Sequence, residues 1–140
     1  MNNDNIDSNI TARLVPDAHR VAVAARLFGV NFPIVLEPAI YGFASRLSRD
    51  YDGGFWRFYE LSNGGFHMAP EGRRFNVVCE NGFQGEMSGD SFGITVCGYA
   101  YGNLSFNGDA FAQICAEHYH LLLDFARGHP EAAAIRSAWD

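Results

Sequence analysis

The chain has 140 residues, 48% of them hydrophobic and 19% charged, a composition that is typical of one globular domain and argues against a disordered chain. Its formal net charge is −6, and all ten basic residues are arginines whose only adjacent pair is Arg73 and Arg74. Duplex DNA binding requires clustered cations, so this distribution argues against tight DNA binding. Sixteen acidic residues without an acidic run also argue against imitation of DNA, which requires a dense array of carboxylates.

The N-terminal segment and the cysteines indicate the compartment. Residues Met1 to Thr11 are polar and acidic, and we expect a flexible tail ahead of a single domain over residues 12–140. The tail lacks the basic and apolar regions of a signal peptide, and no apolar run approaches the length of a membrane span. Cys79, Cys97 and Cys115 are widely spaced in apolar surroundings, which favours free thiols in a reducing compartment. We therefore expect a soluble cytoplasmic protein with no membrane partner.

Two helices are predicted in the first third of the chain. Apolar residues with helical spacing predict a first helix from Pro16 to Phe28, which Gly29 ends. We expect Asn31 to Leu36 to be a loop that contains a proline. A second amphipathic helix begins at Pro38 and ends near Asp50. The apolar stripe of the first helix consists of Val21, Ala24, Ala25 and Phe28.

Two β-hairpins are predicted in the middle of the chain. The first lies within Gly53 to Pro70, where aromatic residues suit a half-buried strand and Asn63-Gly64-Gly65 supplies a turn that tolerates positive φ. The second turns at Asn81-Gly82, a strong hairpin signal. The expected strands are Phe55 to Leu61, Phe66 to Ala69, Phe75 to Cys79 and Phe83 to Met87. We predict that these four strands form one antiparallel sheet.

The segment from Ser88 to Leu104 is ambiguous from its residues alone. Phe92, Ile94 and Val96 alternate like a strand, although other apolar residues fit one side of a helix. Three glycines oppose a helix by about 1 kcal/mol each relative to alanine. Ser88 followed by Asp90 is nevertheless typical of a helix start.

The clearest helix runs from Asp109 to Arg127, with an apolar stripe between Phe111 and Phe125, and we expect it to pack on the sheet. Gly128 ends this helix, and a short last helix follows from Pro130 to about Trp139. The whole order predicts an α+β fold: an antiparallel sheet of about four strands with four to five helices in a single compact domain.

The residues predict no catalytic, cofactor or metal site. On a helix, Cys115 and His118 share the apolar face as core residues while His120 points away, so a metal site is not favoured. His67 lies beside Met68 on a strand, where a packed or edge histidine is a simpler interpretation than a catalytic one. The sequence also lacks GxSxG, HExxH and a phosphate-binding glycine loop. We therefore expect a binding protein and not an enzyme.

The tip of the first hairpin is the candidate interaction surface. Binding residues concentrate on exposed loops that a rigid scaffold holds in place. Turn geometry and a solvated strand face are an alternative explanation for the same residues. The candidates are Arg57, Glu60, Ser62, Asn63, Gly64 and Gly65.

Three longer motifs stand out along the chain. They are YDGGFWRFYELSNGGFHMAP (Tyr51 to Pro70), EMSGDSFGI (Glu86 to Ile94) and HYHLLLDFARGHPE (His118 to Glu131), and they follow LVP at Leu14 to Pro16 and LEP at Leu36 to Pro38. With these motifs, the chain from Leu14 to its C-terminus resembles the ArdB/KlcA family of antirestriction proteins. It departs from the family pattern at Phe92 and in the glycine-rich run that follows.

The resemblance implies a protein of plasmids or other mobile elements that protects incoming DNA from host type I restriction enzymes without imitating DNA. It also implies an α+β fold in which Ser88 to Leu104 is helical, and it supplies no catalytic residues or cofactor. We expect a monomer that contacts a host type I restriction-modification complex or an associated host factor. The alternative is an enzyme or small-ligand-binding domain with a site over the aromatic hairpin.

Overall fold

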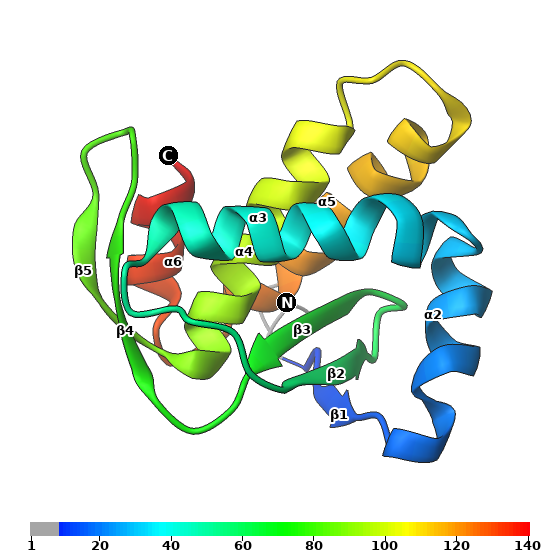
Figure 1. Cartoon of the computed structure of the whole chain (residues 1–140), viewed down its shortest axis with the longest axis horizontal. Helices are drawn as coiled ribbons and strands as arrows, with labels where there is room; N and C mark the ends of the chain where they lie inside the picture. Colours follow the sequence, from blue (N-terminus) through cyan, green and yellow to red (C-terminus); the bar gives the residue numbers. More distant parts are fainter. Residues whose placement is uncertain (1–8) are drawn as a thin grey trace, which may run out of the picture.

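The computed structural model describes residues 9–140, and this part of the chain contains five α-helices and five β-strands (Figure 1). The strands are β1 (Ala12–Leu14), β2 (Trp56–Leu61), β3 (Phe66–Pro70), β4 (Arg74–Val78) and β5 (Gln84–Ser88). The α-helices are α2 (Arg20–Phe28), α3 (Glu37–Leu47), α4 (Gly89–Leu104), α5 (Ala110–Ala126) and α6 (Ala132–Trp139). The predicted α+β class and single compact domain are confirmed. Most of the predicted N-terminal tail, residues 1–8, lies outside the described residues.

The strands form two antiparallel sheets, one with the order β1-β2-β3 and one with β4-β5, so the prediction of a single sheet was wrong. α4 packs along the edge of β3 where the second hairpin would have paired. There the Met68 N–H donates to Cys97 Sγ (3.5 Å), and the Phe66 carbonyl accepts from the Tyr101 hydroxyl (2.8 Å). Side chains of α4 thus satisfy the free edge of β3, and the second hairpin forms its own sheet.

β1 was not predicted from the sequence. It pairs antiparallel with β2, placing Ala12 opposite Leu61. Immediately before β1, the Ser62 N–H donates to the Thr11 carbonyl (2.8 Å), and the Thr11 N–H donates to Ser62 Oγ (2.9 Å). All three residues of β1 are exposed, so no alternation of apolar and polar side chains marks this strand. The last residue of the predicted tail is therefore tied to the tip of the first hairpin.

The first two helical segments meet at a sharp bend. The predicted helix from Pro16 to Phe28 is confirmed, with a 3-10 turn at Asp17–His19 ahead of α2. The segment predicted as a loop is instead a π-helix, Phe32–Leu36, that continues into α3. Pro33 fits in its first turn, where a missing N–H costs no helical hydrogen bond. Within residues 9–140 no single helix is long and apolar enough to cross a membrane. The segments Asp17–Phe28 and Phe32–Leu47 together have the length and composition of a span, but they are bent by 94° relative to each other.

The buried face of α2 matches the predicted stripe in part: Ala24 and Phe28 are buried as predicted, whereas Val21 and Ala25 are exposed. Val21, which the stripe included, is 84% exposed, and Val23 is buried instead. The last residue of the helix is fully packed: the ring of Phe28 lies 4.7 Å from the His118 ring and 5.5 Å from the Phe66 ring. The core contact of α2 therefore concentrates at its C-terminal end, next to the bend.

α4 occupies the centre of the molecule and is buried on nearly all sides (Figure 1). The prediction that Ser88 to Leu104 is helical is confirmed, and Ser88 Oγ caps the helix by accepting the Ser91 N–H at 3.1 Å. A helix without a polar face has no amphipathic period, which is why its sequence pattern was ambiguous.

α5 and α6 cover α4 from the side opposite α3 (Figure 1). Both helices were predicted, and α5 lies mainly along α4 with a smaller contact to the sheet at β3. Asp109 caps α5, since its carboxylate accepts the Ala112 N–H at 2.8 Å. α6 is fixed through Trp139, whose indole N–H donates to the Thr95 carbonyl of α4 at 3.0 Å.

All three cysteines are buried and free. Burial raises the pKa of Cys97 to about 12 and that of Cys115 to about 11, so these thiols are held in their neutral form. Among residues 9–140, no group of three His, Cys, Asp or Glu side chains is arranged to hold a metal ion.

Gly93→Ala should destabilise the fold, because a Cβ at Gly93 would lie 2.5 Å from Ala69 Cα and closer still to the Met68 carbonyl oxygen. Overpacking of this kind costs about 1–3 kcal/mol of unfolding free energy. Gly102→Ala is the matched control on the same helix, since its Cβ would meet only the Tyr119 ring at 3.9 Å. That variant should be neutral or gain up to about 1 kcal/mol of helix propensity. Urea unfolding measures the unfolding free energy of both variants. Equal values for the two would contradict the close packing of Gly93 on β3.

Candidate functional site

Each of the three sequence motifs contributes a polar residue to one cluster at the start of α4. His67 comes from β3, Asp90 from the first turn of α4, and His129 from the turn between α5 and α6. His67 Nε2 lies 3.1 Å from Asp90 Oδ1, and His129 Nε2 lies 2.7 Å from Asp90 Oδ2. We call these three residues the Asp90 cluster. It joins parts of the chain that are far apart in sequence.

The hydrogen-bond pattern assigns the protons of both histidines. His129 Nδ1 accepts the Glu131 N–H at 2.9 Å, so its proton is on Nε2 and is donated to Asp90. His67 is fully buried, stacked between the rings of Tyr59 (4.9 Å) and Phe125 (5.8 Å). Its Nδ1 has no hydrogen-bond partner within residues 9–140, so a proton there would be buried and unpaired. Both rings therefore donate a hydrogen bond to Asp90 through Nε2.

The environment of Asp90 keeps its carboxylate ionised. Burial raises the pKa of Asp90, but the hydrogen bonds from His129 and His67 outweigh this effect and hold the pKa well below its usual range. The position in the first turn of α4 also favours a negative charge, since the N-terminal end of a helix is positive. The side chain nevertheless remains 43% exposed.

A second contact fixes the turn between α5 and α6 to the start of α4. The Ser88 N–H donates to Glu131 Oε1 at 3.0 Å. Burial raises the pKa of Glu131, but hydrogen bonds from Ser88 outweigh it and lower the pKa. This pair and the Asp90 cluster together attach the C-terminal helices to the centre of the molecule.

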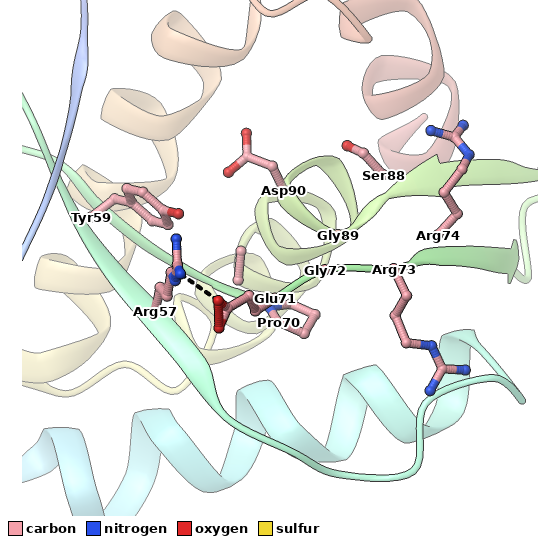
Figure 2. A pocket seen from close by; sticks show the side chains of 11 residues that line it. Arg57, Tyr59, Pro70, Glu71, Gly72, Arg73, Arg74, Ser88, Gly89 and Asp90 are labelled. Atoms are coloured by element: carbon pink, nitrogen blue, oxygen red, sulfur yellow. Dashed lines mark hydrogen bonds and ion pairs between the residues drawn. The ribbon is translucent and has the colours of Figure 1, made fainter.

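Asp90 faces a cavity of ≈ 350 Å³ at the base of the first hairpin (Figure 2). Tyr59 and Arg57 of β2 form the wall opposite Asp90, and Ala69 and Pro70 of β3 contribute apolar surface. Figure 2 shows that Tyr59 and Asp90 point toward one another across this space. The cavity therefore combines one ionised carboxylate with an aromatic ring and an apolar base.

The arginines around the cavity are engaged by the protein itself. Arg57 forms an ion pair with Glu71 at the cavity edge (Figure 2). Arg73 donates to the Asp50 carbonyl at 2.7 Å, and Arg74 donates to Glu86 at 2.8 Å. Both of these last two residues line the cavity, and their side chains point in opposite directions (Figure 2).

The predicted hairpin tip is docked on α5 and is not free. The Asn63 side-chain amide donates to the Leu121 carbonyl (2.9 Å), and its oxygen accepts the Gly65 N–H (3.0 Å). Gly65 is buried, and a Cβ there would lie 3.0 Å from Leu121 Cβ. Ser62 and Gly64 are the exposed members of the tip, and Gly64 has φ +94°.

The two charged candidates lie in different places. Glu60 forms ion pairs with Arg13 at 2.8 Å and with Arg26, which connect β2 to β1 and α2. Arg57 points instead toward the Asp90 cavity. The structure therefore does not bring the six candidate residues into one surface, and their role in binding stays a prediction.

The histidine interpretations are confirmed in part. His118 is buried against Phe28 and His120 is exposed, as expected for a core residue and a surface residue. His67 is a packed histidine, as predicted, but sequence reasoning missed its contact with Asp90. The one available signal was that His67, Asp90 and His129 each lie within a motif that carries the family resemblance.

Asp90→Asn should lower the free energy of unfolding at neutral pH by about 1–3 kcal/mol, because an amide nitrogen cannot accept one of the two histidine N–H groups. The lowered pKa of Asp90 means that the wild-type advantage exists above the unfolded-state pKa of about 3.9 and is lost as pH falls below it. Denaturant unfolding at a series of pH values measures the difference. If the difference in unfolding free energy between wild type and Asp90→Asn stays constant into strong acid, this role of Asp90 is contradicted.

Comparisons with known proteins agree with the three motifs. The antirestriction protein family matches residues 49–140. Two KlcA antirestriction proteins of Escherichia coli are 43% and 39% identical, each over 96% of this chain and 97% of its own length. A solved structure from work on KlcA and ArdB aligns with a TM-score of 0.87 and 39% sequence identity, over 94% of this chain and 96% of its own. Those proteins are described as having a novel fold and antirestriction activity against type I DNA restriction systems in vivo but not in vitro. The chain therefore belongs to the antirestriction protein family.

Proposed function

We propose that this protein protects incoming mobile-element or phage DNA by inhibiting host type I restriction-modification systems. The observation that carries the proposal is the likeness to the KlcA and ArdB structure, with 39% identity and a TM-score of 0.87 over nearly the whole chain. That structure is described together with antirestriction activity against type I systems. A match of both fold and sequence over this length supports the same activity here.

The charge distribution supports an action other than imitation of DNA. Several of the acidic side chains that would have to form a negative array are instead paired with arginines. The pairs include Glu60 with Arg13 and Arg26, Glu71 with Arg57, Glu86 with Arg74, and Asp124 with Arg127. A continuous negative field that attracts any DNA-binding protein requires unpaired charge, so a specific contact is the better explanation.

The partner in our proposal is the host restriction complex or a host factor associated with it. The relatives were active in vivo but not in vitro, a contrast that supports a requirement for a further component of the cell. We propose that the protein acts in the bacterial cytoplasm as a monomer, without a cofactor and without a catalytic step of its own.

A small-ligand or enzymatic role is the second candidate, and the Asp90 cavity is the observation that favours it. The cavity lies at the base of the aromatic hairpin and holds an ionised carboxylate. A catalytic role would need a nucleophile within reach of Asp90 and its two histidines. Cys97 does not meet this need, because it is fully buried with a pKa of about 12.

Expression of the protein in a host with an active type I system should raise the plating efficiency of unmodified phage while methylation of host DNA stays largely intact. The reason is that the proposed contact blocks restriction and leaves modification free. Plating on an isogenic host without the restriction system is the control and should be unchanged. If the expressed, folded protein gives no protection against any type I system tested, the proposed function is wrong.

Gly64→Asn tests the hairpin tip in the same plating assay. Gly64 is exposed, a Cβ at this position would have no atom within 4 Å, and asparagine tolerates its positive φ better than most residues. The variant should therefore unfold within about 1–2 kcal/mol of wild type. If the tip contacts the partner, the added side chain should reduce protection. Full protection by this folded variant would place the contact surface elsewhere.

A further inference from the structure

We propose that the cavity beside Asp90 binds a basic side chain, an arginine, from a protein partner. The proposal goes beyond the antirestriction function and rests on it only in taking a protein as the source of the guanidinium group. It is carried by four features of the described residues. These are the absence of an arginine partner for Asp90, the free acceptor positions of its carboxylate, the wall formed by Tyr59, and the hydrogen bonds that already occupy the N-terminus of α4.

No arginine within residues 9–140 forms an ion pair with Asp90. Its two contacts are the Nε2 groups of His67 and His129, since the Nδ1 of His129 accepts a backbone N–H and that of His67 is buried without a partner in residues 9–140. Arg57, the cation that faces the cavity, is already paired with Glu71. The other two lining arginines, Arg73 and Arg74, are likewise paired with Asp52 and Glu86, so the Asp90 carboxylate is left to favour a cationic ligand.

The carboxylate is oriented for a further donor. Each oxygen of Asp90 accepts one hydrogen bond, at 3.1 Å from His67 and 2.7 Å from His129, and an ionised carboxylate has about four acceptor positions. One position on each oxygen is thus left for a ligand. A guanidinium group offers two parallel N–H donors that match a carboxylate in this way. Because the histidines fix the carboxylate in advance, little ordering is needed on binding.

The walls of the cavity suit the rest of an arginine side chain. Tyr59 lies across the cavity from Asp90 and is held in place by stacking on His67, at 4.9 Å between ring centroids. A guanidinium group stacks favourably on such a ring. Ala69 and Pro70 provide apolar surface for the aliphatic stem.

The alternative of an anionic ligand at the start of α4 is not favoured. The positive end of this helix is already used by the protein, since Asp90 itself lies in the first turn. The Ser88 N–H is bound by Glu131, and the Ser91 N–H is bound by Ser88 Oγ. The guanidinium groups of Arg73 and Arg74 already donate to the Asp50 carbonyl and to Glu86, so they are engaged by the protein itself.

The test is a titration of the isotope-labelled protein with N-acetyl-L-argininamide, followed by amide NMR shifts. N-acetyl-L-citrullinamide, which has nearly the same shape without the charge, is the matched control ligand. We expect saturable shifts at Tyr59, Gly89 and Asp90 with the arginine probe, and binding at least about tenfold weaker with the citrulline probe, because the charge-assisted pair is lost. Equal binding of both probes, or the absence of saturable shifts at these residues, overturns the proposal.

Two variants with opposite expected effects separate binding from folding. Asp90→Asn should abolish the saturable shifts while its melting curve shows whether it is folded. Arg57→Gln should bind the arginine probe more tightly, because Glu71 loses its internal partner and adds a free carboxylate to the cavity edge. A misfolded protein cannot bind more tightly, so unchanged or weaker binding by Arg57→Gln contradicts the proposal. A titration with inorganic phosphate completes the test, and specific phosphate binding without arginine binding also overturns it.

The outcome is distinguishable from that of the antirestriction proposal. Probe binding by a protein that gives no protection in the plating assay refutes the antirestriction function and supports the cavity assignment. Protection by a protein that does not bind the probe refutes the cavity assignment and supports the function.

Discussion

The contact between α4 and β3 determines how the rest of the molecule is arranged. The two backbones approach so closely that a Cβ at Gly89 would lie 2.5 Å from the Pro70 carbonyl oxygen, and Gly93, one turn later, meets β3 in the same way. Because these two glycines face the strand, Asp90 lies at the margin of the contact, within reach of His67. The close packing that builds the core therefore also places the carboxylate beside the cavity. α3, α5 and α6 then surround α4, whose side chains satisfy the edge of β3.

Much of the fold could be predicted because local signals agree with the final structure. Asn63-Gly64-Gly65 and Asn81-Gly82 mark real hairpins, and the apolar stripe from Phe111 to Phe125 marks a real helix. The errors arise where long-range contacts decide the outcome. The number of sheets depends on α4, which takes the edge of β3, and β1 exists only because β2 offers a partner. Pro33 suggests a loop when its sequence is considered alone, although a proline in a first helical turn is equally well tolerated.

The site was harder to predict than the fold. His67, Asp90 and His129 are separated by long stretches of chain, and no spacing rule connects them. Each residue also has an ordinary local explanation, as a packed strand residue, a helix-start residue and a turn residue. The hairpin tip shows the opposite case: its residues looked available for binding, but Asn63 and Gly65 serve to dock the tip on α5. The exposure of a side chain and its ion pairs depend on contacts between distant parts of the chain, so they cannot be predicted from a short stretch of sequence.

The pairing of β1 with β2 has a consequence for how the chain folds during synthesis. β1 leaves the ribosome well before Trp56–Leu61, the strand that completes it, and the helices α2 and α3 emerge in between. At about 5–20 residues per second, the wait until the first hairpin is complete lasts several seconds, whereas an isolated helix forms in about a microsecond. During that interval Phe28, Phe32 and Leu36 have no core to enter. The burial of these side chains therefore depends on partners that are synthesised later, such as Phe58, Phe66 and His118.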